Sequence, residues 1–213
     1  YHILVNGAQV YDSFEDKTLL REELTPQQAM CMLHFLKSRN VLRGVYIDGL
    51  GHMSREDFSE IEAVAATPAT AALMRRSYQT DEDLDAVTAQ HDSVQKIIAF
   101  FRNPDDKQAT IREITARFPG YAVSSSLGNN IEINAQNATK GSALCFLCEK
   151  IGIPIGQCMA FGDGTNDYSM LRAAGFGVAM GNASEEVQSC ADAVTETNEE
   201  DGVARMIERV LGL

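Results

Sequence analysis

The sequence predicts an α/β fold in which a parallel sheet is interrupted by a large inserted α+β domain. From residue 156 onward, short apolar runs alternate with segments of helical periodicity, which is typical of a parallel sheet covered by helices. Another strand-like apolar run stands at residues 2–5, and the long segment between these regions has a different rhythm. The two ends of the chain are therefore expected to form one sheet around the insertion.

The elements of the C-terminal region follow from this alternation. Strands are expected at residues 158–161, 175–180 and near 193, and helices at residues 168–173, near 185 and at 201–211. The apolar run at residues 2–5 is expected to join the same sheet.

The inserted region is expected to open with a helix at residues 25–39, because Thr25 can cap it and Pro26 stands at the favoured first position. Further strands are expected at residues 41–48, 94–101, 121–125 and 130–134, and further helices at 55–65, 81–89 and 105–118. These strands favour an antiparallel sheet. No repeat or low-complexity linker interrupts the region, so a compact domain is predicted.

Composition and charge exclude several classes of partner. The 213 residues carry a formal net charge of -12 and no cluster of Lys and Arg, which argues against a nucleic-acid backbone as the partner. Apolar runs such as residues 97–101 are far shorter than the roughly 20 residues that span a bilayer, so no membrane partner is expected. A small anionic substrate fits, since a metal ion or a few cations can dominate a site in an acidic protein.

The five cysteines are an odd number in apolar surroundings, which favours a reducing cytoplasmic location over a disulfide framework. Cys145 and Cys148 form a C-x-x-C that could be redox-active or supply half of a zinc site. They fall within a helical pattern, and no second Cys or His pair has matching spacing. We therefore interpret both as small buried apolar residues.

The strongest chemical signal is the segment Gly-Asp-Gly-Thr-Asn-Asp at residues 162–167, where an apolar strand gives way to a helix. Ligands bind at the carboxyl ends of strands in such sheets. Gly162 and Gly164 permit a tight turn, while Asp163 and Asp167 supply two hard oxygen ligands of the kind Mg²⁺ prefers. The alternative is a simple helix cap, which explains one of these residues but not the whole set.

A second signal is Lys140, in the first turn of a helix that opens near residues 137–141. A cation there opposes the helix dipole by about 0.3–1 kcal/mol, which suggests that an anion offsets its charge. The alternative is a solvated lysine in a helix capped by Thr139.

Together these motifs indicate a family. Lys140-Gly141, then residues 162–167, then Met-Gly-Asn-Ala at residues 180–183 resemble the C-terminal half of the Cof-type phosphatases of the haloacid dehalogenase (HAD) superfamily. Asn-Gly-Ala at residues 6–8 is similar to the tripeptide that leads towards the cap in that family. The resemblance covers essentially the whole chain.

The resemblance implies a Rossmann-like HAD core, incomplete at its N-terminus, formed by residues 1–21 and 133–213, with an inserted α/β cap at residues 22–132. It implies that Asp163 ligates Mg²⁺ and that Asp167 supports the metal directly or through water. Lys140 would neutralise the transferring phosphoryl group, and Asn166 would contact the phosphate or hold the loop. Asn6 would lie beside the phosphate pocket.

The chain departs from the family at its start. Members begin with a strand ending in Asp-x-Asp-Gly-Thr, whose first Asp attacks phosphorus, and no such segment precedes Tyr1. Asp-Leu-Asp at residues 83–85 matches superficially but follows polar residues and precedes Ala86, so we interpret it as a solvated helix. The nucleophile is expected upstream of residue 1, and the chain as written is expected to be inactive.

The predicted function is a Mg²⁺-dependent phosphatase for small phosphorylated metabolites such as sugar phosphates, acting through an aspartyl-phosphate. The alternative is a non-catalytic phosphate or metabolite binding module on the same scaffold. A fragment of a P-type ion pump shares a similar loop but is disfavoured by the lack of a transmembrane run. In the cap, Asp48, His52 and Asn129 are interpreted as surface or turn residues rather than substrate ligands.

Overall fold

The structure, a computed structural model, describes residues 1–213, and the chain divides into two compact units. Unit 1 comprises Tyr1–Leu20 and Thr139–Leu213, and unit 2 comprises Arg21–Ala138. The C-terminal boundary of the inserted unit therefore lies after residue 138, whereas the sequence predicted it after residue 132. The reason is that β9 (Asn130–Ala135) hydrogen-bonds along its length to two strands of unit 2, so the whole strand belongs to that unit.

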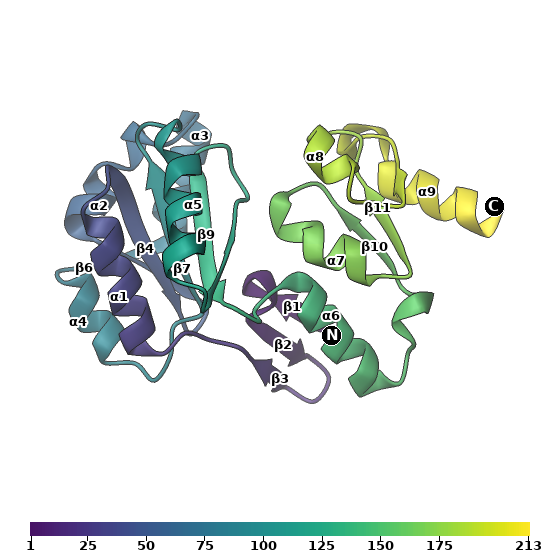
Figure 1. Cartoon of the computed structure of the whole chain (residues 1–213), viewed down its shortest axis with the longest axis horizontal. Helices are drawn as coiled ribbons and strands as arrows, with labels where there is room; N and C mark the ends of the chain where they lie inside the picture. Colours follow the sequence, from purple (N-terminus) through teal and green to yellow (C-terminus); the bar gives the residue numbers. More distant parts are fainter. The chain divides into compact units, whose positions relative to one another are not determined.

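Unit 1 contains the predicted parallel sheet, with strand order β10-β11-β12 (Figure 1). Its strands are β10 (Met159–Gly162), β11 (Phe176–Ala179) and β12 (Ala193–Val194), and its helices are α6 (Lys140–Ile151), α7 (Tyr168–Ala173), α8 (Glu185–Gln188) and α9 (Gly202–Leu211). Leu171 of α7, Ala179 of β11 and Val187 of α8 are buried together, and their packing holds α7 and α8 against the sheet. The α/β fold class predicted from the alternating rhythm is confirmed.

The expectation that the first strand joins this sheet is wrong. Strand β1 (His2–Leu4) pairs antiparallel with β2 (Gln9–Asp12), and β3 (Lys17–Arg21) completes a separate three-stranded sheet. The tight turn between β1 and β2 explains this, because Asn6 and Gly7 have φ values of 61° and 102° and reverse the chain at once. The strand therefore pairs with its immediate neighbour.

Unit 2 is built on a six-stranded sheet with the order β6-β5-β4-β7-β9-β8. All of its pairings are antiparallel except β5–β6, which is parallel. The other strands are β4 (Val41–Ile47), β5 (Leu50–Ser54), β6 (Tyr78–Asp81), β7 (Lys96–Phe101) and β8 (Tyr121–Ser124), and the helices are α1 (Pro26–Lys37), α2 (Arg55–Ser59), α3 (Pro68–Ser77), α4 (Leu84–Ala89) and α5 (Asp106–Arg117).

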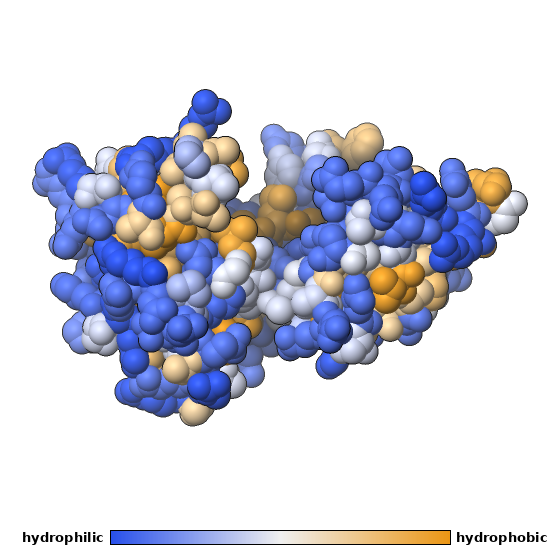
Figure 2. Space-filling model, turned by 90° about the horizontal axis from the view of Figure 1, so that it is seen from above, coloured by the Kyte–Doolittle hydropathy of each residue, from blue (hydrophilic) through white to orange (hydrophobic).

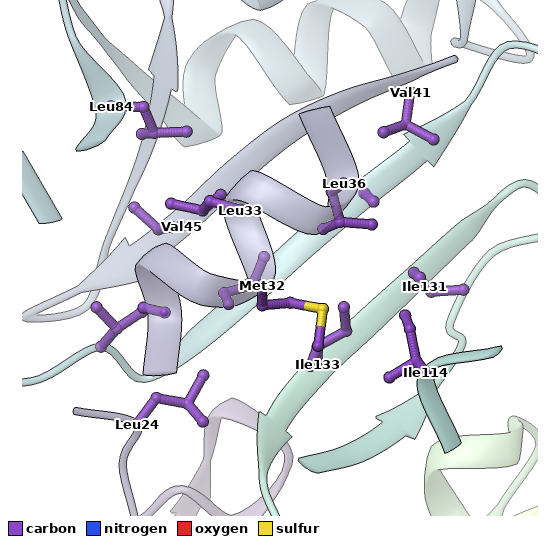
Figure 3. Packing of buried hydrophobic residues seen from close by; sticks show 14 of the residues in the cluster. Leu24, Met32, Leu33, Leu36, Val41, Val45, Leu84, Ile114, Ile131 and Ile133 are labelled. Atoms are coloured by element: carbon purple, nitrogen blue, oxygen red, sulfur yellow. The ribbon is translucent and has the colours of Figure 1, made fainter. Parts of the chain in front are cut away.

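Helix α1 begins where the sequence predicts. Thr25 caps it and forms a reciprocal capping box with Gln28, and Pro26 occupies the first helical position. Its buried face, which includes Met32 and Leu36, packs on the sheet (Figure 3). Helix α5 lies over the same sheet face through Ile114 (Figures 1 and 3).

Both faces of the six-stranded sheet are covered, because inward and outward side chains alternate along each strand. In β7, Ile97 and Ala99 belong to the cluster beneath α1, whereas Ile98 and Phe100 belong to the opposite cluster with Met74 of α3. The central strands are thus apolar on both faces.

Five elements of unit 2 differ from the expectations. The helix expected at residues 55–65 is only α2 followed by a 3₁₀ turn at Ile61–Ala63. Strands β5 and β6 and helix α3 were not expected. The helix expected from residue 81 begins later as α4, capped by the Asp83 carboxylate, while Asp81 ends β6.

The face seen in Figure 2 is largely hydrophilic, with hydrophobic atoms exposed at several places, including the end of α9. Val210, Leu211 and Leu213 are the exposed apolar residues there. None of the helices combines the length and the apolar content needed to cross a membrane.

Candidate active site

The site is built on the loop that follows β10. The strand ends at Gly162, Asp163 comes next, and a 3₁₀ turn at Thr165–Asp167 leads into α7. A Cβ at Gly162 would lie 2.4 Å from the Cβ of Asp167, so only glycine lets the Asp167 side chain fold back beneath the strand end. This close approach places Asp163 and Asp167 on the same short loop.

The Asp167 carboxylate is buried and fully engaged. Its Oδ2 accepts hydrogen bonds from the backbone N–H groups of Asp163 and Gly164, both at 3.0 Å. Its Oδ1 lies 2.5 Å from Nζ of Lys140. The Asp167 side chain is 6% exposed and that of Lys140 is 29% exposed, so the ion pair is largely shielded from water. Asp167 therefore fixes both the loop and the lysine.

Lys140 is the first residue of α6, and Thr139 caps the helix as expected. The anion that the helix dipole argument suggested is Asp167, so Lys140 is paired as well as partly exposed, and the Thr139 cap of the alternative interpretation is also present. Gly141 makes this arrangement possible: its N–H donates to Oγ of Ser169 at 3.0 Å, and a Cβ at residue 141 would lie 2.3 Å from the Ser169 carbonyl oxygen. The close packing of α6 on α7 delivers Lys140 to Asp167.

Asp163 has a different environment from Asp167, because its side chain is exposed at the strand end. Its Oδ2 accepts one hydrogen bond, from Nδ2 of Asn182 at 3.2 Å. The backbone N–H of Asn198 donates to Oδ1 of Asn182 at 3.1 Å, which sets the orientation of the amide. Asn182 has no predicted role in the sequence analysis, although its place just after the neighbouring parallel strand β11 is the signal that could have found it.

The predicted residues Asn6 and Asn166 are also brought together. Nδ2 of Asn166 donates to Oδ1 of Asn6 at 3.3 Å across 160 positions of sequence. Gly7 allows this turn to approach the start of α6 closely, because a Cβ at residue 7 would lie 2.2 Å from the carbonyl oxygen of Thr139. The turn after β1 is thus packed against the start of α6, beside Lys140.

Of these groups, Lys140, Asp163 and Asp167 border a cleft of about 500 Å³ in unit 1. It is lined by Ile3, Lys140, Phe161, Gly162, Asp163, Asp167, Met170, Met180 and Val203. Charged groups lie at the strand end, while the remaining wall is apolar. Asp163 and Asp167 are the only carboxylates in this lining, and the cleft borders β10, which is an edge strand of its sheet.

The donor set can be tested against a metal ion. No cluster of three or more His, Cys, Asp and Glu side chains suited to a metal is present. The exposed carboxylate of Asp163 is a hard oxygen ligand, which is what Mg²⁺ takes together with waters and substrate phosphate. The Asp167 oxygens already accept three hydrogen bonds, so this residue fits an indirect role.

The cap residues considered from the sequence, Asp48, His52 and Asn129, all belong to unit 2. Asp48 occupies the turn between β4 and β5 with φ of 49°, as interpreted. Asn129 donates to the Val64 carbonyl oxygen at 2.7 Å and holds a loop. The surface or turn interpretation is wrong for His52, which is buried in β5 and whose Nδ1 lies 2.9 Å from Asp81 Oδ2.

The structure thus combines a parallel α/β unit with an inserted α/β unit. Acidic, lysine and asparagine side chains lie together at the strand ends of the first unit, as in an enzyme that acts on a small polar substrate. Comparison with known proteins identifies the family: the sequence model of haloacid dehalogenase-like hydrolases matches residues 1–207. The chain belongs to this family. Its resemblance to the Cof-type phosphatases is confirmed.

Among solved structures, a haloacid dehalogenase-like hydrolase from B. subtilis superposes with a TM-score of 0.81 and 30% identity, covering 95% of this chain and 76% of that one. The structure of TM0651 from Thermotoga maritima gives a TM-score of 0.69 and 29% identity, covering 96% and 73%.

Curated relatives match over shorter segments. Phosphatase YwpJ of Bacillus subtilis is 52% identical over 87 residues, which is 41% of this chain and 30% of that protein. The 5-amino-6-(5-phospho-D-ribitylamino)uracil phosphatase YcsE of the same organism is 42% identical over 103 residues, 48% of this chain and 41% of that protein. The matches thus span well under half of these relatives.

Proposed function

We propose that this chain is part of a Mg²⁺-dependent phosphatase that hydrolyses small phosphate esters through an aspartyl-phosphate. The observation that carries the proposal is the 2.5 Å contact between Lys140 and Asp167 beside the exposed Asp163 carboxylate. A fixed cation next to an open oxygen ligand, at the carboxyl ends of parallel strands, suits a phosphate group and its metal ion.

Within this proposal the residues have separate tasks. Lys140 neutralises charge on the phosphoryl group, and Asp167 holds Lys140 and the backbone of the loop in place. Asp163 is the direct metal ligand, oriented by Asn182, and Asp167 supports the metal indirectly. Bound Mg²⁺ would stabilise the developing negative charge on the phosphoryl oxygens.

The paired amides of Asn6 and Asn166 supply a polar edge to the same region. We propose that Asn166 contacts the phosphate or holds the loop, and that Asn6 lies beside the phosphate. Unit 2 corresponds in this proposal to the cap domain, and unit 1 to the catalytic core.

The attacking carboxylate is proposed to come from a segment outside residues 1–213. Asp167 is buried with both oxygens engaged, and Asp163 cannot serve as metal ligand and attack phosphorus together. The cleft lining offers no third carboxylate. A strand added to the free edge of β10 would cover Phe161, Met180 and Val203, and its carboxyl end would fall beside Asp163.

The proposed substrates are small phosphorylated metabolites, including sugar phosphates. YcsE is named for a phosphorylated ribityl compound, which is a relative's substrate of this chemical class. The net charge of -12 disfavours polyanionic partners, so a single local cation and metal would select a small anion. A cytoplasmic location is proposed because all five cysteines are free thiols.

The test is a panel of phosphate esters assayed with the protein extended through the coding sequence that precedes residue 1. Phosphate release should require Mg²⁺, stop with EDTA and fall sharply in the Asp163→Asn and Lys140→Met variants. A matched control is Lys150→Met, at the far end of α6 from the cleft, which should retain activity. Phosphate-ester binding without turnover, in a protein lacking an upstream Asp-x-Asp-Gly-Thr, would favour the non-catalytic binding module instead.

A further inference from the structure

Two thiols in unit 1 lie unusually close together and have no part in the proposed phosphatase site. Sγ of Cys148 and Sγ of Cys158 are 3.3 Å apart. Cys148 is buried, with 4% exposure, whereas Cys158 is partly exposed. The Cys158 thiol also donates a long hydrogen bond of 3.9 Å to the carbonyl oxygen of Pro154. A disulfide needs sulfurs about 2.05 Å apart, so the pair must close by roughly 1.3 Å.

The pair is not the C-x-x-C that the sequence suggests. Cys145 and Cys148 are one helical turn apart, but Cys145 is exposed, so its interpretation as a buried apolar residue is wrong. The partner of Cys148 comes instead from ten residues later, just before β10.

The two cysteines join the elements that carry the candidate active site. Cys148 lies two turns along α6 from Lys140, and Cys158 directly precedes β10, whose end carries Asp163. A bond between them would tie the C-terminal half of α6 to the start of that strand. It would close a short loop through Gly152 and the 3₁₀ turn at Ile155–Gln157 without crossing the cleft.

We propose that Cys148 and Cys158 form a reversible disulfide when the protein meets a peroxide, and that Cys158 is the thiol oxidised first. Cys158 takes this role because it is the more exposed of the two sulfurs. Burial, together with the hydrogen bond to Cys158, raises the pKa of the Cys148 thiol to about 11, so Cys148 is a poor first nucleophile. It is well placed to resolve an oxidised Cys158.

The chemistry balances in two steps. The Cys158 thiol loses its proton, and the thiolate attacks one oxygen of hydrogen peroxide; the O–O bond breaks, a sulfenic acid forms on Cys158, and the departing hydroxide takes up a proton to leave as water. Cys148 then loses its proton and attacks the Cys158 sulfur; the S–O bond breaks, and the departing hydroxide takes up a proton as a second water. Two thiols have given two electrons to the peroxide, and a dithiol reductant reverses the bond.

Peptide mapping of the 213-residue chain tests this directly. The reduced protein is treated with hydrogen peroxide, free thiols are blocked with N-ethylmaleimide, and the protein is digested with trypsin. Cleavage after Lys140, Lys150 and Arg172 separates Cys148 from Cys158 onto peptides 141–150 and 151–172. The expected result is a cross-link between these peptides, removed by dithiothreitol, with Cys31 and Cys190 still alkylated.

Matched variants identify the partner. Cys145→Ser should keep the cross-link, and Cys158→Ser should abolish it. In Cys148→Ala the sulfenic acid on Cys158 should persist and be trapped by dimedone. The bond should raise the unfolding midpoint of wild type and Cys145→Ser by about 5–10 °C, because it closes a short loop. No such rise should occur in Cys158→Ser.

Two results would overturn the proposal. One is wild-type Cys158 that passes to the sulfinic acid with no cross-link, which would mean that Cys148 does not resolve it. The other is a cross-link that disappears in Cys145→Ser, which would make Cys145 rather than Cys148 the partner of Cys158. Both results are independent of phosphatase activity, and the unfolding curves of each variant show whether it is folded.

Discussion

Replacing Asp167 with asparagine should destabilise the protein far more than the same change at Asp163. The amide has one acceptor oxygen, whereas the carboxylate serves three donors: Nζ of Lys140 and the backbone N–H groups of Asp163 and Gly164. If the amide oxygen faces the two N–H groups, its NH₂ group faces the Lys140 ammonium, donor against donor. One of the two sides of the loop must lose its partner.

The magnitude follows from burial and charge. Hydrogen bonds to a charged group contribute about 1.5–3 kcal/mol, and breaking a buried ion pair costs about 3–5 kcal/mol. The Lys140 side chain is 29% exposed and can turn to water, so the lower part of this range applies. We expect Asp167→Asn to lower the free energy of unfolding by about 2–3 kcal/mol, or the unfolding midpoint by roughly 4–12 °C.

Urea and thermal unfolding followed by circular dichroism are the assays, with Asp163→Asn as the control. Asp163 is exposed and accepts a single hydrogen bond from Asn182, so its variant should lose no more than about 1 kcal/mol. Equal stability of the two variants would refute the assigned role of Asp167 in holding the loop and Lys140.

Three further outcomes are expected. Lys140→Ala should lose about 1–3 kcal/mol in urea unfolding, because it leaves the Asp167 carboxylate buried without its cation, and this loss outweighs the relief of the unfavourable helix dipole interaction. Wild-type stability would contradict the pairing. In isothermal titration of the extended protein, Asp163→Ala should weaken Mg²⁺ binding more than Asp167→Ala, and a reversed order would count against Asp163 as the direct ligand. Burial raises the pKa of the Cys148 thiol to about 11, above the value of about 8.5 expected in the unfolded chain. The neutral thiol therefore contributes its full stabilisation below about pH 8.5, and this contribution is lost as the pH rises towards about 11. Its alkylation by iodoacetamide under reducing conditions should therefore still accelerate above pH 9, and a plateau at that pH would show that the thiol is not protected.

Much of unit 1 was predictable because its signals are local. The strand-to-helix change around residues 162–167 and the glycines at 162 and 164 point to a tight loop with close backbone approach, and the structure has both. The contact between Lys140 and Asp167 was not predictable from spacing, because it depends on the packing of α6 against α7. The contact between Cys148 and Cys158 was not predicted from the sequence for the same reason.

The errors have physical causes as well. The strand at residues 2–5 looked like a member of the parallel sheet, but the turn at Asn6 and Gly7 sends it into a local hairpin. Strand β5 was missed although Asp48-Gly49, both at positive φ, is a strong two-residue hairpin signal. The polar sequence of β6 conceals a strand that pairs in parallel with β5, a long-range pairing that periodicity does not register.

The central claim is that residues 1–213 hold the electrostatic half of a phosphoryl-transfer site whose nucleophile lies on another segment. Phosphate release by the 213-residue chain, measured beside the same chain joined to its upstream coding sequence, tests it most directly. Loss of a covalent nucleophile can lower the rate by on the order of 10⁶, so the shorter chain should show no turnover above background and the longer one ordinary enzyme rates. Turnover at ordinary enzyme rates by the 213-residue chain, copurifying with it through successive columns, would contradict the claim.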